Sequence, residues 1–306
     1  MSLADLSALA AQQHGLMTHE QVTKEMSRTR LSRLVRAKTW QVVRPGVYRR
    51  AAKTQTEAQE LLAVQLWADR TAVVSHSSAA RLLGLNVARK ELELTIARFK
   101  GDLPGVTLHR TKTLDFEEDC REFKGILVTD GARTVIDLAC SLQEEDAAVL
   151  VEEAWRKRIA APHWVMKKLE AMKKRPRGGV ALLEILRDCG TRKGPLESAL
   201  EVRVWRLLKR HGLTRLTANV PFSDEYGQPG RIDMAFIDQS LAIECDGWES
   251  HGTREAFDSD RKRMQRLVAL GWRVLPVTWK HLTEEPEDLV ARVREALSYR
   301  VTRAAR

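Results

Sequence analysis

The sequence predicts a mixed α/β protein of the α+β kind that is divided into several domains. Its 306 residues exceed the length of a typical single domain. Helical and strand-like patterns follow one another through most of the chain, and its last third shows the order helix, three strands, helix, strand, helix. We therefore expect three domains, formed by residues 1–55, 56–190 and 191–306.

The first predicted domain combines three short helices with a hairpin. Apolar residues at helical spacing mark the first helix, and Thr18 and Ser27 are the predicted caps of the second and third. Two strand-like segments, 40–43 and 47–50, flank a turn signal at residues 44–46. This order predicts a winged helix, whose third helix enters the major groove of DNA while the hairpin contacts the phosphate backbone.

Positive charge is concentrated in two stretches of a chain whose formal net charge is +10. Residues 26–56 contain nine Lys or Arg and no acidic residue, and residues 156–177 contain nine against one Glu. Clusters of one sign indicate a nucleic-acid face better than net charge does, although a solvated face of a basic protein is the alternative. The predicted DNA-contacting side chains belong to the third helix and the turn: Arg28, Arg30, Arg33, Arg36 and Arg44.

The second predicted domain mixes helices with short strands and shows no catalytic constellation by spacing. His76 lies between Ser75 and Ser77, but adjacent side chains point in different directions, so a helix cap is the simpler interpretation. The basic stretch 173–179 predicts an exposed hinge ahead of the last domain.

The last predicted domain carries three carboxylates on two apolar strands. Asp233 lies in the strand 231–237, and Glu244 and Asp246 lie in the strand 241–246. Burying an unpaired carboxylate costs free energy, so such groups are usually paired or bound to a metal. Because side chains alternate along a strand, Glu244 and Asp246 share one face.

The turn between these two strands decides whether the carboxylates converge. A two-residue turn at 239–240 would place Asp233 opposite Asp246 and diagonal to Glu244, whereas a three-residue turn would put Asp233 on the other face. Convergent carboxylates, with the main-chain carbonyl of Cys245, would form a hard oxygen site for Mg²⁺ or Mn²⁺. Such a cation activates water and neutralises charge that develops on a phosphate.

Other side chains are candidates for the same site. Glu201 lies in the helix before the sheet, where it could add a carboxylate or orient a lysine or water. His251 could shuttle a proton, and Arg261 could hold a phosphate. The alternative is that the acids form ion pairs with Arg231 or Arg273. The predicted catalytic set is Glu201, Asp233, Glu244, Asp246, His251 and Arg261.

Five blocks of the last domain support a family resemblance. They are Ser198-Ala-Leu-Glu201, Gly230-Arg-Ile-Asp233, Ile243-Glu-Cys-Asp-Gly247 with His251, Asp260-Arg-Lys-Arg263 and Leu270-Gly-Trp-Arg-Val. Together they resemble the endonuclease domains related to very-short-patch mismatch-repair nucleases, of the PD-(D/E)XK superfamily. The resemblance implies a restriction-endonuclease-like αβββαβ core, with Asp233 and Glu244 at the metal positions and Glu201 as the helix glutamate. Asp246 stands where a catalytic lysine often occurs, although the mismatch-repair-like branch commonly lacks that lysine.

Four shorter segments resemble a second family. They are Gln13-His-Gly-Leu, Gly46-Val-Tyr, Ser75-His-Ser-Ser-Ala-Ala and Arg133-Thr-Val-Ile-Asp-Leu. These segments are similar to the abortive-infection (type IV toxin–antitoxin) antitoxin-like family. The resemblance implies a DNA-binding, autoregulating winged helix followed by an antitoxin-like middle domain, and it makes a toxin or another protein a candidate partner.

Composition argues against several classes of protein. The longest apolar runs fall short of the roughly 18 residues of a transmembrane helix, so no membrane partner is expected. The N-terminus lacks the basic and apolar regions of a secretion signal. The cysteines form no CxxC pair, which offers neither a zinc site nor a disulfide framework. These features favour a cytoplasmic protein.

The sequence therefore predicts a cytoplasmic, Mg²⁺- or Mn²⁺-dependent DNA endonuclease that a winged helix targets to DNA. One alternative is a transcriptional regulator or antitoxin whose nuclease-like domain only binds. A second is a structural protein that holds a partner with its basic faces. The carboxylates Glu201, Asp233 and Glu244 favour the enzyme, and the missing lysine at position 246 favours the alternatives.

Overall fold

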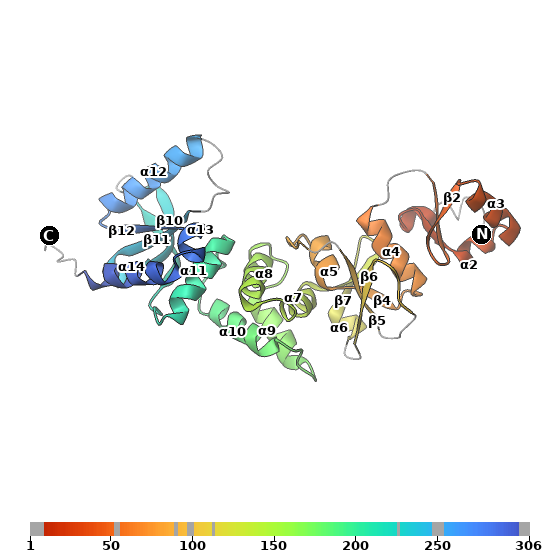
Figure 1. The fold of residues 1–306 in the computed structure, drawn as a ribbon, viewed down its shortest axis with the longest axis horizontal. Helices are drawn as coiled ribbons and strands as arrows, with labels where there is room; N and C mark the ends of the chain where they lie inside the picture. Colours follow the sequence, from red (N-terminus) through yellow and green to blue (C-terminus); the bar gives the residue numbers. More distant parts are fainter. Residues whose placement is uncertain are drawn as a thin grey trace. The chain divides into compact units, whose positions relative to one another are not determined.

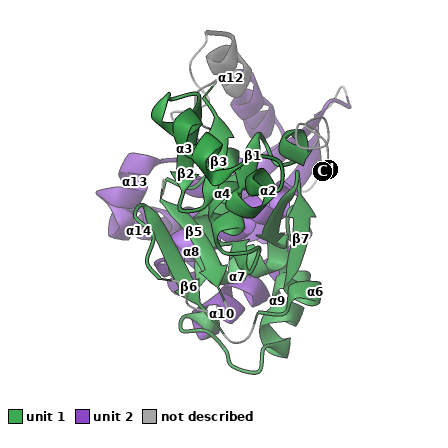
Figure 2. Cartoon of the chain, turned by 90° about the vertical axis from the view of Figure 1, so that its right-hand side faces the viewer, with its two compact units in different colours: residues 1–141, 159–179 green, residues 142–158, 180–306 purple. Residues whose placement is uncertain are grey.

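The computed structural model describes residues 9–51, 56–88, 91–96, 101–111, 114–224, 227–246 and 254–299, except for the side chains of residues 254–261. Strands in this part of the chain form three sheets among many helices, which confirms the predicted mixed α/β class (Figure 1). The chain divides into two compact units (Figure 2). Unit 1 contains residues 1–141 and 159–179, and unit 2 contains residues 142–158 and 180–306.

Unit 1 holds two of the three sheets. Its elements are β1 (Leu16–Thr18), α2 (His19–Thr23), α3 (Arg28–Arg36), β2 (Trp40–Arg44), β3 (Val47–Arg50), α4 (Glu57–Trp67), β4 (Ala72–Val74), α5 (His76–Leu82), β5 (Leu92–Ile96), β6 (Val106–Arg110), α6 (Phe116–Asp119), β7 (Cys120–Phe123), β8 (Ile126–Thr129), α7 (Gly131–Ala139) and α9 (Pro162–Ala171). The strands are ordered β1-β3-β2 in one sheet and β6-β5-β4-β8-β7 in the other.

The N-terminal module follows its local signals. The Thr18 hydroxyl accepts a hydrogen bond from the Gln21 amide, and the Gln21 side chain accepts one from the Thr18 amide at 2.8 Å, so the predicted cap of α2 is confirmed. Ser27 caps α3 as predicted. The sequence did not reveal β1, a three-residue strand that pairs with β3, because so short a segment carries little periodicity.

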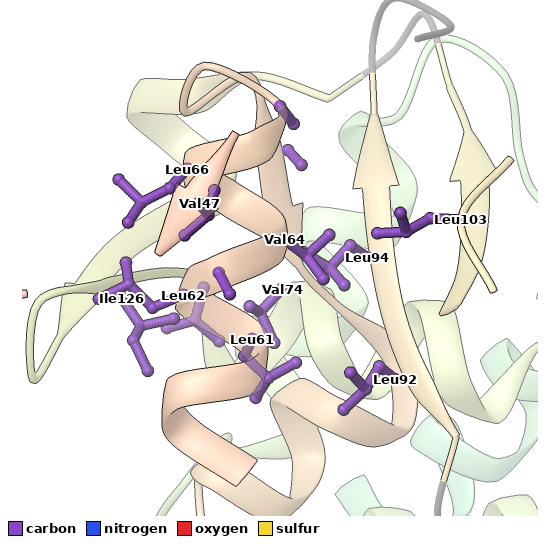
Figure 3. Close-up of a cluster of buried hydrophobic side chains, with 14 of the residues drawn as sticks. Val47, Leu61, Leu62, Val64, Leu66, Val74, Leu92, Leu94, Leu103 and Ile126 are labelled. Atoms are coloured by element: carbon purple, nitrogen blue, oxygen red, sulfur yellow. The ribbon is translucent and has the colours of Figure 1, made fainter. Parts of the chain in front are cut away.

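Helix α4 builds the main apolar core of unit 1. It contacts β1, β2 and β3 of the smaller sheet and β4 and β8 of the larger one. Because it faces two sheets, all of residues 61–66 are buried. Leu61, Leu62 and Val64 pack in one cluster with residues of both sheets, including Val47 and Leu94 (Figure 3). The predicted boundary between residues 55 and 56 therefore lies within one shared core.

The larger sheet of unit 1 has one apolar and one polar face. Leu92 and Leu94 of β5 belong to the apolar cluster around α4. Since side chains alternate along a strand, Glu93 and Thr95 point to the opposite face. There the Glu93 amide donates to the hydroxyl of Ser78 in α5 at 2.9 Å. A buried polar layer thus lies beside this face of the sheet.

Unit 2 contains the third sheet. Its elements are α8 (Glu144–Arg156), α10 (Gly179–Gly190), α11 (Ala199–Arg210), β9 (Thr217–Ser223), β10 (Pro229–Phe236), the 3-10 helix η1 (Ile237–Gln239), β11 (Leu241–Asp246), α12 (Arg254–Ala269), β12 (Arg273–Thr278), α13 (Trp279–Thr283) and α14 (Pro286–Ser298). The strand order is β12-β11-β10-β9, with β12 parallel to β11 and the other pairs antiparallel. Helices α12 and α14 lie on opposite sides of this sheet (Figure 1). The predicted αβββαβ order is thus present from α11 to β12.

A buried carboxylate ties helix α8, within residues 142–158, to this unit. Glu152 of α8 accepts hydrogen bonds from the Leu196 amide at 3.0 Å and from the Arg192 guanidinium. Helices α8 and α11 also contact each other. The predicted boundary at residue 191 would separate Glu152 from both of these partners.

No helix in the described part of the chain combines the length and the apolarity needed to cross a bilayer.

Candidate functional site

The connection between β10 and β11 determines which carboxylates meet. The two-residue turn expected at 239–240 is wrong, because η1 and Ser240 form a longer connection in which Ser240 takes a left-handed conformation with φ 47°. The observed register pairs Met234 with Ile243 and Phe236 with Leu241. Continuing that register places Asp233 opposite Glu244, rather than opposite Asp246. The observed register differs by two residues from the one that a two-residue turn would give, so each side chain stays on the same face of the sheet. Asp233 and Glu244 therefore share one face.

Asp233 and Glu244 are held side by side and buried. The Asp233 carboxylate accepts a hydrogen bond from the Cys245 amide at 2.9 Å, across the end of the β10–β11 ladder. Glu244 is 2% exposed, and its Oε1 is buried without a hydrogen-bond partner in the described structure. A buried acceptor that lacks a donor costs free energy, which marks this oxygen as a position for a cation or a donor from outside the chain.

Arg263 of α12 contacts both carboxylates. Its guanidinium donates to Glu244 Oε2, and its Nη1 lies 3.9 Å from Asp233 Oδ1. Leu267, one helical turn further, packs with Ala235 and Ala242 on the sheet, which positions this face of α12 over the acids. The same guanidinium also donates to the Arg231 carbonyl at 3.1 Å.

The acids of this site disfavour each other's charged forms. Burial and the neighbouring charge of Asp233 raise the pKa of Glu244 to about 8, although Arg263 opposes the shift. Burial and the charge of Asp233 also raise the pKa of Glu201, which places Glu201 within electrostatic reach of Asp233. Glu201 is itself buried in the first turn of α11, where its carboxylate accepts from the Glu197 amide at 2.9 Å. A bound cation would favour the charged forms of these acids and so lower the raised pKa values.

The structure places the remaining predicted catalytic residues to different extents. Asp246 lies two residues beyond Glu244 on β11, is half-buried, and its charge also raises the pKa of Glu244. Arg261 lies in α12, but its side chain is outside the described residues. His251 lies outside them altogether.

The ion-pair alternative involves a different arginine from those expected. Arg231 pairs with Glu197 at 3.0 Å, and Arg273 donates to the carbonyls of Ala296 and Gln239. Arg263 was visible in the sequence as part of a family block, but only its helical position relative to Leu267 could have suggested that it faces the acids. Sequence spacing alone does not determine that position, because it depends on how α12 packs on the sheet.

The donor set suits a hard cation only when the backbone contributes. No group of three or more His, Cys, Asp or Glu side chains in the described ranges is arranged to hold a metal ion. The predicted set has two carboxylates, Asp233 and Glu244, and the main-chain carbonyl of Cys245. These are the oxygen donors that Mg²⁺ and Mn²⁺ prefer, and the lone oxygen of Glu244 is available to a cation.

The predicted DNA-contacting arginines are on the surface of the N-terminal module. Arg28, Arg30, Arg33 and Arg36 of α3 are exposed, whereas Leu31 of the same helix is buried. Arg44 is half-buried at the end of β2, next to a turn in which Gly46 has φ 75°. Four of the five predicted side chains are therefore accessible to a polyanion.

A second buried acid, which spacing did not reveal, lies in unit 1. Glu93 is 1% exposed, and its carboxylate accepts from the Ser77 amide at 3.0 Å and from the Ser77 hydroxyl. His109 Nε2 lies 3.1 Å from its other oxygen, and the His109 ring stacks on His76 with centroids 3.6 Å apart. The helix-cap interpretation of this segment is wrong, because Ser75 occupies the N-cap of α5 and its side chain makes no capping bond there. The Ser75 hydroxyl bonds to Thr95 at 2.8 Å instead.

Comparison with known proteins finds relatives over most of the chain. Two proteins of Mycobacterium tuberculosis, the uncharacterized proteins MT2308 (strain CDC 1551 / Oshkosh) and Rv2248 (strain ATCC 25618 / H37Rv), are each 28% identical over 256 residues. Each match covers 82% of this chain and 90% of the relative. The crystal structure of the RV2827C protein from the same species matches with a TM-score of 0.43 and 15% identity, covering 60% of this chain and 75% of that one.

The nuclease-like sheet has a match of its own. The family model REase_MTES_1575, of restriction-endonuclease-like domains, matches residues 201–297. This range begins at Glu201 and includes Asp233, Glu244 and Arg263, so it contains the whole acidic site described above. The match supports a restriction-endonuclease-like domain in the C-terminal part of the chain.

Proposed function

We propose that the chain is a divalent-metal-dependent DNA endonuclease whose hydrolytic site is formed by Asp233, Glu244 and Glu201. One observation carries this proposal. Asp233 and Glu244 lie side by side on adjacent strands, and one Glu244 oxygen has no hydrogen-bond partner among the described residues, inside the range that matches restriction-endonuclease-like domains. A purely structural acid pair would be expected to have its oxygens satisfied.

Asp233, Glu244 and the Cys245 carbonyl are the groups that would hold the cation. Bound there, Mg²⁺ or Mn²⁺ would supply charge neutralisation and lower the pKa of a water. The Cys245 amide fixes the Asp233 carboxylate in place. A cation between these buried carboxylates would compensate the free-energy cost of burying their charges.

Arg263 is the chain's own cation at this site, and a metal would compete with it for Glu244. Released from the carboxylates, its guanidinium would be free to hold a phosphate oxygen of the DNA backbone, for which its planar donor geometry is suited. Glu201, whose pKa is raised by burial and by Asp233, is placed to accept or donate a proton near the site.

The N-terminal module would bring the nuclease to DNA as a winged helix. The exposed arginines on α3, with the half-buried Arg44 at the end of β2, support this role, because one-sided positive charge attracts the phosphate backbone. In this proposal residues 1–55, 56–190 and 191–306 keep their predicted roles of DNA binding, positioning and cleavage, although the compact units group residues 142–190 differently.

The second candidate is a DNA-binding regulator or antitoxin with an inactive nuclease-like domain. The ion pair of Arg263 with Glu244, together with an aspartate at 246 in place of lysine, favours this candidate. In it, Arg263 would take the place of the metal permanently.

One assay separates the two candidates. The full chain is incubated with supercoiled, linear and mismatched DNA in Mg²⁺, Mn²⁺ or EDTA, beside Glu244→Gln and Asp238→Asn. Asp238 is an exposed acid of η1 on the same sheet, so its variant controls for the loss of one charge. We expect cleavage with metal by the wild type and by Asp238→Asn only. DNA binding without cleavage under every condition would favour the regulator.

A further inference from the structure

Helix α9 presents an exposed tryptophan that the fold does not use. Val165 and Leu169 of this helix are buried, and α9 contacts α7. Trp164 is 56% exposed on the outer side. Large aromatic side chains usually contribute buried area, so a tryptophan left in solvent on a well-packed helix requires an explanation outside the fold.

Basic side chains surround this tryptophan. Lys167 lies one turn away, with its Nζ 5.3 Å from the centre of the Trp164 ring. Lys173, Lys174, Arg175 and Arg177 are exposed in the segment that follows the helix. Glu170 is the exposed acid between them. The surface formed by Trp164, Lys167 and residues 173–177, here called the α9 surface, therefore carries a strong excess of positive charge.

The lysines of the α9 surface differ from the neighbouring Lys168 in their ion pairing. Lys168, on the inner side, pairs with Asp119 and Asp130, both at 2.9 Å. In the part of the chain that the structure describes, Lys167, Lys173 and Lys174 have no carboxylate within ion-pair distance. The structural lysine is thus satisfied, whereas the outer ones remain available to an external polyanion.

We propose that the α9 surface binds single-stranded DNA, with Trp164 stacking on an unpaired base and the following basic residues tracking the phosphates. Aromatic platforms within basic grooves are the physical basis of single-strand binding, since every base has a π-face. In a duplex the bases already stack on each other, so a flat exposed ring finds its partner only where strands have separated.

This inference extends the proposed function but depends on it only for the identity of the substrate. A nuclease that acts on supercoiled or mismatched DNA meets unpaired bases, and the α9 surface includes none of the carboxylates of the acidic site. Binding can be measured without cleavage, so the two proposals fail independently.

The test measures binding of the full chain carrying Glu244→Gln, in EDTA, to fluorescein-labelled oligo(dT) and to a duplex of equal length. Trp164→Ala is compared with Trp164→Phe, which retains a stacking ring, and with Tyr299→Ala. Tyr299 is an aromatic residue, 63% exposed, whose hydroxyl donates to the Glu295 carboxylate at 3.3 Å. Lys173→Gln/Lys174→Gln is compared with Arg121→Gln/Lys124→Gln, an exposed pair on β7 and its turn.

We expect Trp164→Ala to weaken single-strand binding about 5- to 150-fold, the range that one stacked base implies. Trp164→Phe should stay within about threefold of the parent, and duplex binding should not change. The Lys173/Lys174 variant should lower the salt slope for oligo(dT) by about 1.4, at about 0.7 per lost contact, and the Arg121/Lys124 variant should not.

Three results would overturn the proposal. In the first, Trp164→Ala binds oligo(dT) with the same affinity as the parent or as Tyr299→Ala. Trp164→Ala could lose duplex and single-strand binding equally. The parent could sediment with phosphatidylserine vesicles in a Trp164-dependent manner while oligo(dT) binding ignores Trp164, which would assign the surface to a membrane. Circular dichroism and melting curves of each variant show whether its fold is retained.

Discussion

Two buried glutamates, one in each unit, show how differently the same side chain can be accommodated on a strand. Glu93 of β5 is 1% exposed, and Glu244 of β11 is 2% exposed. Burial alone would raise the pKa of both. For Glu93, hydrogen bonds from His109 and Ser77 outweigh burial and lower the pKa to about 2. For Glu244, burial and the charge of Asp233 raise the pKa to about 8.

The difference lies in the partners rather than in the depth of burial. Glu93 has donors on both oxygens, so its charge stabilises the fold around it. Glu244 faces two other acids, and despite the contact with Arg263 one of its oxygens has no donor in the part of the chain that the structure describes. A satisfied buried acid is explained by structure, whereas an acid held against other acids points to a ligand that is positively charged.

Glu152 shows that the difference between Glu93 and Glu244 does not arise from the unit in which each acid lies. It lies in unit 2 with Glu244, yet it accepts from the Leu196 amide, the Arg192 guanidinium and the Cys189 thiol. It therefore belongs with Glu93 as a structural acid. Conservative changes at the three positions should separate catalysis from stability.

The largest expected effect is on cleavage. Asp233→Asn and Glu244→Gln should each lower the cleavage rate about 1000-fold or more, because each keeps the side chain's size but removes a charge that holds the cation. Glu93→Gln, assayed at a temperature where it is folded, should retain cleavage within a few-fold. Equal losses in the Glu93 and Glu244 variants would remove the functional distinction between the two acids.

The next largest effect is on the stability of unit 2. Glu152→Ala leaves the Arg192 guanidinium, whose side chain is 4% exposed, without its main partner. We expect a loss of about 3–5 kcal/mol. Hydrogen-exchange mass spectrometry should show faster exchange in α8 and α11 but not in α4.

The same acid tests the domain boundary. A fragment that starts at residue 191 lacks Glu152 and should be less stable than the same sheet in the full chain. Equal protection of β10 and β11 in the fragment and the full chain would show that residues 142–158 and 180–190 are dispensable for unit 2.

A pH dependence follows from Glu93. Its pKa is lowered from the ordinary 4.5 to about 2, so the folded state favours the charged form. This contribution to stability is present above about pH 4.5 and is lost as pH falls toward 2, and it amounts to about 3 kcal/mol at neutral pH. Denaturant unfolding should show the gap between wild type and Glu93→Gln closing below pH 4.5. Glu20→Gln, at an acid whose side chain is 80% exposed, is the control and should show no such gap.

The smallest effect concerns DNA binding by the N-terminal module. Replacing Arg33, Arg36 and Arg44 with Gln should weaken duplex binding for all sequences and lower the salt slope by about 0.9 per lost phosphate contact. The matched control removes three exposed charges elsewhere in unit 1, at Arg70, Arg121 and Lys124. An unchanged slope in the first variant would leave the module without a DNA-binding role.

Local sequence signals predicted the secondary-structure elements well, but they did not predict how these elements pack against one another. β11 has the bounds predicted for the apolar strand 241–246, and Thr18 and Ser27 cap helices as their side chains predict. The β10–β11 register was not predictable, because Ser240 takes a left-handed conformation without the usual Gly or Asn signal. The predicted convergence of Asp233 and Glu244 nevertheless occurs, since the longer connection leaves both side chains on the same face of the sheet.

Contacts between segments that are distant in the sequence could not be predicted for a different reason. Arg263 reaches Glu244 only because α12 packs on a particular face of the sheet, and Glu152 reaches Arg192 only because α8 packs on α11. The polar face around Glu93 was interpreted as a helix cap, because Ser75, Ser77 and Ser78 are also good capping residues. Their actual partners lie on a strand more than ten residues away.

Melting curves with Mn²⁺ test the central claim most directly, since they need no DNA substrate. Wild type and the exposed-acid control Asp238→Asn should melt at higher temperature as Mn²⁺ rises through millimolar concentrations, because a cation that binds the folded state stabilises it by about 2.7 kcal/mol at 100 times its Kd. Asp233→Asn and Glu244→Gln should be as stable as wild type or more so without metal, since repulsion among the acids is relieved, and should not respond to Mn²⁺. A wild-type melting temperature that ignores Mn²⁺, together with variants destabilised by the loss of Arg263's partners, would contradict the metal site and favour a nuclease-like domain that only binds.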